Sequence, residues 1–133
     1  MITKAGFTTT IQIEEQKGLT LPDHERQTIV HCQMRLPPNP DLHIWMETLI
    51  RIWPTTFLIQ DNGIRKKLLF FDKITAYPVW MTVRLPHTFT LIFEGLDEEC
   101  LQFDLVEEIP QQGGFEARDI LRNTSDVYRM DII

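Results

Sequence analysis

The sequence NPDLHIWMETLIRIW, residues 39–53, has the clearest periodic pattern in the chain. Asn39 can cap a helix, Pro40 suits the first helical position, and Asp41 is favourable near the positive end of the helix dipole. Apolar side chains recur at spacings of three and four residues, which puts them on one helical face: Leu42, Trp45, Met46, Leu49 and Trp53. Pro54 would end the helix. The pattern predicts one amphipathic helix, and the helix contains no reactive group.

On both sides of this segment the sequence has the patterns of β-strands. In residues 27–36 apolar and polar side chains alternate, which is typical of a strand with one buried face. The apolar positions of this strand are Val30, Cys32, Met34 and Leu36. Asp61-Asn62-Gly63 lies between two apolar runs and predicts a β-hairpin turn. The other expected strands are residues 8–14, 55–60, 64–71, 74–85, 88–94 and 101–107.

The expected fold is therefore mainly β: an antiparallel β-barrel or sandwich of about seven strands with one amphipathic α-helix. This domain is expected to span residues 1–109. Residues 110–133 are expected to form a flexible joint and a C-terminal arm, with a short helix over 115–122. Residues 126–133 are rich in apolar side chains, which favours docking of the arm onto this subunit or onto a neighbouring one.

The composition is that of an ordinary globular domain. Of the 133 residues, 43% are hydrophobic and 24% are charged, so a buried core is expected. The formal net charge of −6 argues against general binding to nucleic acid or to an anionic membrane surface. Neither a secretory signal nor a stretch long enough to cross a bilayer is recognisable. We expect a cytoplasmic protein in which Cys32 and Cys100 are reduced thiols, with a disulfide as the alternative.

No catalytic or metal-binding constellation is recognisable. His31 and Cys32 are neighbours in a predicted strand and point to opposite faces, so they cannot act together. Cys100 follows an acidic turn whose charge would raise the pKa of the thiol. His43 has only Glu47 at helical spacing, which is more typical of a solvated helix face than of a metal site. No catalytic, cofactor-binding or metal-binding residue is assigned, and no cofactor is expected.

Several aromatic side chains fall in or near the predicted strands: Phe70, Phe71, Tyr77 and Trp80. Such residues can form a platform on which bases stack. The acidic net charge argues against that function, and aromatic side chains in strands usually fill a core. We therefore interpret these four as packing residues.

Four short motifs occur in a familiar order: TIVHCQM (28–34), DLHIWM (41–46), KLLFFD (67–72) and TAY (75–77). In this order the chain resembles the tube protein of type VI secretion systems, the family called Hcp, with its branch TssD. Phage tail tubes share the same architecture. The resemblance covers residues 7–94, about two-thirds of the chain.

The resemblance implies a structural protein and not an enzyme. Tube subunits form rings that stack, and the lumen carries effectors. The implied partners are further copies of the chain or other tube and secretion components, with no nucleic acid and no membrane insertion. Export as part of the injection apparatus is also implied. Trp80, Tyr128 and Met130 are the residues that we expect at an interface.

Two alternatives stay open. A small β-barrel binding module for an unassigned ligand or protein partner would have a concave, partly polar interior and would form no rings. An enzyme would need a pocket that joins His31 or His87 to a carboxylate with a perturbed pKa.

Overall fold

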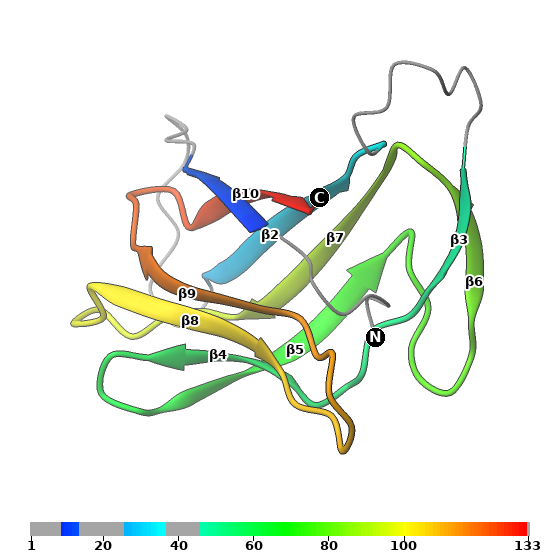
Figure 1. Cartoon of the computed structure of the whole chain (residues 1–133). Coiled ribbons are helices and arrows are strands. Elements are labelled where there is room, and N and C mark those ends of the chain that lie inside the picture. Colours follow the sequence, from blue (N-terminus) through cyan, green and yellow to red (C-terminus); the bar gives the residue numbers. More distant parts are fainter. Residues whose placement is uncertain (1–8, 14–25, 37–45, 133) are drawn as a thin grey trace.

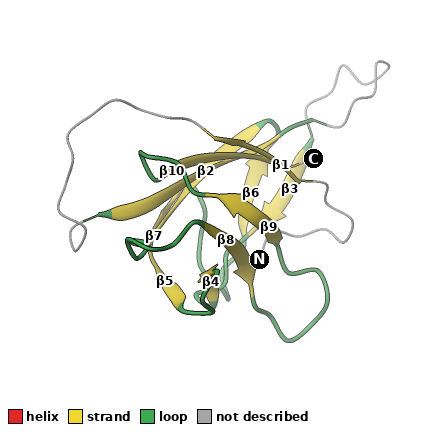
Figure 2. Ribbon diagram, turned by 90° about the vertical axis from the view of Figure 1, so that its left-hand side faces the viewer, coloured by secondary structure: helices red, strands yellow, loops and turns green. Residues whose placement is uncertain are grey.

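The computed structural model describes residues 9–13, 26–36 and 46–132. Within these residues the chain forms strands and no helix (Figure 1, Figure 2). The strands are β1 (Thr9–Ile13), β2 (Gln27–Met34), β3 (Glu47–Ile50), β4 (Thr56–Gln60), β5 (Arg65–Asp72), β6 (Met81–Arg84), β7 (His87–Glu94), β8 (Gln102–Glu107), β9 (Glu116–Leu121) and β10 (Val127–Ile132). The prediction of a mainly β fold is confirmed.

Eight strands form one curled sheet in the order β1-β10-β2-β7-β5-β4-β8-β9. Every neighbouring pair is antiparallel except β10 and β2, which run parallel. The sheet is therefore mixed, and not antiparallel as predicted. The end strands β1 and β9 do not pair with each other, so the described strands make a half-barrel (Figure 1). β3 and β6 form a separate two-stranded sheet.

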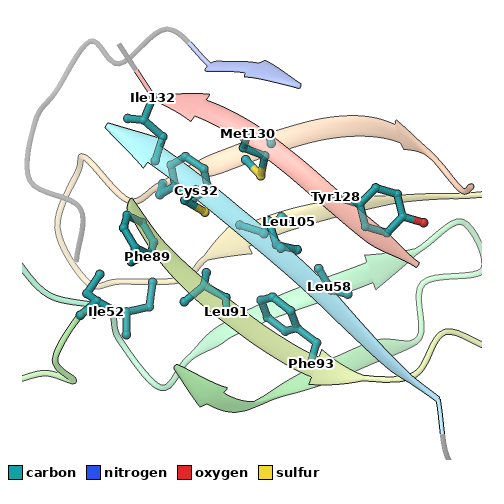
Figure 3. Close-up of a cluster of buried hydrophobic side chains, with 14 of the residues drawn as sticks. Cys32, Ile52, Leu58, Phe89, Leu91, Phe93, Leu105, Tyr128, Met130 and Ile132 are labelled. Atoms are coloured by element: carbon teal, nitrogen blue, oxygen red, sulfur yellow. The ribbon is translucent and has the colours of Figure 1, made fainter. Parts of the chain in front are cut away.

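The core lies inside the curl. Side chains from β2, β7, β8 and β10 converge there, and Figure 3 shows Cys32, Phe89 and Met130 among them. The rings of Phe103 on β8 and Tyr128 on β10 meet edge to face, with centroids 5.0 Å apart. Burying one large apolar side chain contributes about 1.5–3 kcal/mol, so this cluster makes a large contribution to the stability of the fold.

The clearest predicted strand and the predicted hairpin are both confirmed. On β2, Val30, Cys32 and Met34 are buried, while Leu36 lies beyond the end of the strand and is exposed. β4 and β5 pair antiparallel around the expected turn. Gly63 has a φ of 85°, a conformation that costs glycine little.

The predicted amphipathic helix is wrong where the structure describes it. Glu47–Ile50 forms β3, and Ile52 makes a bridge with Ala76. Residues 39–45 of the predicted helix lie outside the described residues. The physical reason is a second period in the same segment: Ile50 and Ile52 are buried, whereas Leu49 is exposed. That alternation of two residues suits a strand, and a partner strand is present in β6.

The C-terminal part of the chain also differs from the prediction. Residues 115–122 do not form a short helix, because Glu116–Leu121 is β9 and pairs with β8. β10 lies inside the sheet, between β1 and β2. Of the two predicted docking modes of the arm, the structure has the first: the segment packs on its own subunit. Residues 110–132 thus contribute two strands to the same sheet as residues 9–109.

Candidate interaction surface

The most unusual surface belongs to the two-stranded sheet and the turn beside it. We call the outer face of β3, residues 51–53, residues 77–80 and β6 the ribbon face. In the strand register Leu49 lies opposite Thr82, and Ile50 lies opposite Met81. Ile50 and Val83 are buried against the core, so this sheet has one inner and one outer face.

An arginine surrounded by three aromatic rings forms the centre of the ribbon face. The guanidinium carbon of Arg51 lies 3.8 Å from the ring centroid of Trp80, 4.6 Å from that of Tyr77 and 5.9 Å from that of Trp53. The Arg51 guanidinium also donates a hydrogen bond of 3.1 Å to the carbonyl of Pro78. Cation–π contacts of this kind contribute about 0.5–1 kcal/mol each at an exposed site, so the four side chains hold one another in place.

Backbone hydrogen bonds bring these side chains together. The Ile52 N–H donates to the Thr75 carbonyl, and the Tyr77 N–H donates to the Ile52 carbonyl, both at 2.8 Å. This parallel bridge places Tyr77 beside Trp53, and their rings stack with centroids 3.8 Å apart. The predicted strand over 74–85 is therefore interrupted: residues 74–80 form a turn around Pro78, and only Met81–Arg84 is a strand.

The ribbon face exposes several large apolar side chains to solvent. Leu49, Tyr77, Val79 and Trp80 are each between 40% and 57% exposed. The interpretation of Tyr77 and Trp80 as packing residues is therefore wrong, and it is also wrong for Phe70 on β5, which is exposed. Two donors, Arg51 Nε and Trp53 Nε1, are buried and have no hydrogen-bond partner among the residues that the structure describes. A buried donor without an acceptor costs about 1–3 kcal/mol. Trp, Tyr and Arg are also the residues most enriched at the energetic centres of protein interfaces.

A second surface feature is an open cleft of about 800 Å³ at the end of β7. Four carboxylates line it: Glu94, Asp97, Glu98 and Glu99. Its other lining residues include two cationic ones, Arg26 and Lys66, and two apolar ones, Leu69 and Leu96. We call this the acidic cleft.

Asp97 is held in place in the acidic cleft by several hydrogen bonds. Its carboxylate accepts hydrogen bonds from Gln60 Nε2 at 2.9 Å and from Lys66 Nζ at 2.8 Å. The Asp97 N–H donates to Gln60 Oε1 at 2.8 Å, so one buried side chain of β4 holds the loop from both sides. The hydrogen bond from Gln60, followed by that from Lys66, lowers the pKa of Asp97. Glu98 and Glu99 are exposed, and neither forms an ion pair with a residue that the structure describes.

A smaller cavity of about 300 Å³ lies on the outer face of β10, β2 and β7 and includes His31. His31 Nδ1 is 2.9 Å from Thr90 Oγ1. His87, the other candidate, has its Nε2 2.7 Å from the Lys73 carbonyl. His24 and His43 lie outside the described residues. His31 thus contacts a hydroxyl group and His87 contacts a backbone carbonyl.

The two cysteines are buried, and they are not joined to each other. Burial raises the pKa of the Cys32 thiol well above its usual range. The pKa of Cys100 is also raised, as predicted, but the main cause is burial and not the acidic turn before it. A thiol with a raised pKa is a poor nucleophile at neutral pH.

The three residues expected at an interface lie in two different environments. Trp80 is on the ribbon face and is exposed. Tyr128 and Met130 are fully buried in the core of this chain, so neither offers surface to another subunit (Figure 3). Burial raises the pKa of Tyr128. Sequence reasoning missed Arg51, although the outward alternation of Leu49, Arg51 and Trp53 could have indicated it.

Among the described residues, no group of three or more metal-binding side chains lies close enough to hold an ion. In that same part of the chain, no helix is long and apolar enough to cross a membrane. Comparison of the chain with protein-family models, curated proteins and solved structures gave no match. Function is therefore inferred from the surfaces of the chain itself.

Proposed function

We propose that the protein is a structural subunit that acts by self-assembly, either in a contractile-injection tube or as an adaptor of the same kind. The observation that supports this best is the ribbon face. Its exposed Trp80 and Tyr77 contact the guanidinium of Arg51, and this combination of Trp, Tyr and Arg is the composition of an interface centre. An apolar surface of this kind is stabilised when a partner covers it.

The fold is compatible with this function. A curled sheet can serve as the wall of a ring, and repetition of one contact between unlike patches closes a ring when the rotation allows it. Burial raises the pKa of both thiols, which disfavours the alternative of an enzyme with a cysteine nucleophile.

The test is the mass of the purified protein in solution. Light scattering on a size-exclusion column, with negative-stain images of the peak, is expected to reveal ring-shaped oligomers whose fraction rises with concentration. A monomer at every concentration up to the solubility limit would contradict self-assembly of the isolated chain.

The second candidate is a small binding module for another protein, and the acidic cleft supports it. A cleft of about 800 Å³ lined by four carboxylates fits a basic segment of a partner. This function predicts a monomer that binds basic peptides in a salt-dependent manner. Titration with an Arg-rich peptide, followed by fluorescence anisotropy at low and high salt, would distinguish it from self-assembly.

A further inference from the structure

We infer that the ribbon face of one copy of this chain docks into the acidic cleft of the next copy. This inference rests on the proposed function, since it names the two surfaces through which self-assembly occurs. The occupant of the cleft is therefore a second copy of the same chain, and the contact joins two different patches.

The two surfaces lie at opposite ends of the molecule. In Figure 1 β3 and β6 stand on the right, whereas the loop that follows β7 is on the left. The acidic cleft includes that loop, with Gly95 and Glu98 among its residues. Patches at opposite ends of a subunit can both be occupied at once, so each copy can contact two neighbours.

The chemistry of the two surfaces is complementary. The ribbon face carries Arg51 and Arg84 against one carboxylate, Glu47, which lies opposite Arg84 in the strand register. The cleft carries twice as many carboxylates as cations. Leu69, which is exposed, gives the cleft apolar surface on which an aromatic ring can pack. Carboxylate oxygens are acceptors only, and Arg51 Nε has no acceptor within the described part of the chain. Arg51 Nε is buried, so the Arg51 side chain must change rotamer before this atom can contact a carboxylate of the other copy. Such rotamer changes are common at interfaces.

Two other modes of self-association are less favourable. Pairing of one ribbon face with another would bring together the Arg51 guanidinium groups at the centres of the two faces, and like charges at an interface are repulsive. Extension of the sheet at β9 is opposed by the irregularity of that edge. β9 is bulged against β8, its Asp119 has a φ of 57°, and its Arg118 is charged and exposed. Bulges and charges are the features that protect an edge strand from pairing.

The experiment uses two variants that each lose one surface. Trp80→Ala removes the central ring of the ribbon face, and the pair Glu98→Lys with Glu99→Lys reverses the charge of the cleft. Each variant alone is expected to need at least about a tenfold higher concentration than the wild type to associate. An equimolar mixture is expected to form a heterodimer and nothing larger, because one intact ribbon face then meets one intact cleft.

Control variants change the same residue types elsewhere on the surface. Leu121→Ala removes an exposed apolar side chain of β9, and Glu116→Lys reverses an exposed charge on the same strand. Both are expected to assemble like the wild type. Val79→Asp replaces Trp80→Ala if that variant does not fold, since Val79 is also exposed on the ribbon face. Circular dichroism spectra and unfolding curves establish which variants are folded.

The outcomes separate this contact from self-assembly itself. Sedimentation velocity that detects the heterodimer supports docking of the ribbon face into the cleft. If the wild type assembles but the folded variants assemble equally well, or their mixture stays monomeric, the contact is wrong and the proposed function stands. If the wild type is monomeric throughout, both the proposed function and this contact are overturned.

Discussion

Glu107 connects the ribbon face to the main sheet through a single buried carboxylate. It lies on β8, and its oxygens accept hydrogen bonds from the Trp53 N–H at 3.0 Å and the Phe115 N–H at 3.1 Å. The first bond holds the end of the ribbon face, and the second holds the chain as it enters β9. A buried charge is tolerated here because backbone donors surround it.

Replacement of Glu107 by alanine is expected to lower the free energy of unfolding by about 3 kcal/mol, because two buried backbone donors lose a charged acceptor. Urea unfolding followed by tryptophan fluorescence measures this change. The matched control is Glu108→Ala, which removes the adjacent carboxylate from a surface ion pair with Arg65. The free energy of unfolding of the control variant should be close to that of the wild type. An equal decrease in the two variants would show that Glu107 has no special role.

Asp97 makes the stability of the fold sensitive to acid. Its hydrogen bonds with Gln60 and Lys66 lower its pKa below the ordinary value of 3.8. A carboxyl group with a lowered pKa in the folded state stabilises the fold above its unfolded-state pKa, and this contribution is lost as the pH falls through the folded-state pKa.

We therefore expect the free energy of unfolding to decrease as the pH is lowered from about 5 to about 2, and to decrease less in Asp97→Asn. Because Asp97 is partly exposed, solvent screening keeps the difference small. Urea unfolding at several pH values measures both slopes. Identical slopes for wild type and Asp97→Asn would mean that other carboxylates account for the acid sensitivity.

At the scale of the element, local pattern predicted some strands and misassigned others. β2 and the β4–β5 hairpin could be predicted because alternation and the Asn62-Gly63 turn agree with each other. In residues 46–53 the apolar side chains fit both the spacing of three to four residues that is typical of a helix and the alternation of two that is typical of a strand. Pairing with β6 decides between these periods, and β6 lies far away in the sequence. Residues 116–121 likewise become a strand because β8 is beside them.

A substitution in β10 can test whether the C-terminal residues belong to the domain. Met130 is buried between β1 and β2, so Met130→Asp places a carboxylate in the core at a cost comparable to the whole stability of a small domain. We expect this variant to lose its cooperative unfolding transition. Arg129→Gln, at the exposed neighbouring position of the same strand, should keep the transition. A Met130→Asp variant that unfolds like wild type would mean that residues 110–133 are an arm outside the core.

At the scale of the whole molecule, the sequence alone could indicate only one member of the candidate surface. Trp80 was expected at an interface, whereas Arg51 and Tyr77 were not. Their proximity comes from the bridge between Ile52 and Ala76, a contact between distant segments that no local pattern contains. Tyr128 and Met130 were misplaced because their apolar character suits a subunit interface and a core strand equally well.

The positions of the ribbon face and the acidic cleft in the whole molecule explain why both can be occupied at once. The acidic cleft lies at one end of the main sheet, and the separate two-stranded sheet that carries the ribbon face lies at the other end of the molecule (Figure 1). A rigid body with unlike patches at its two ends associates head to tail, and this association gives rings or filaments. Since both patches are charged, raised salt is expected to weaken the contact.

The most direct test is a cross-link from the ribbon face in the assembled protein. A photoreactive benzoylphenylalanine replaces Trp80, and the labelled chain is mixed with an isotopically heavy copy so that links between copies can be recognised by mass spectrometry. The account predicts links from position 80 to residues 94–99 of the other copy. Links only to the ribbon face of the other copy, or no links between copies in a sample that has assembled, would contradict it.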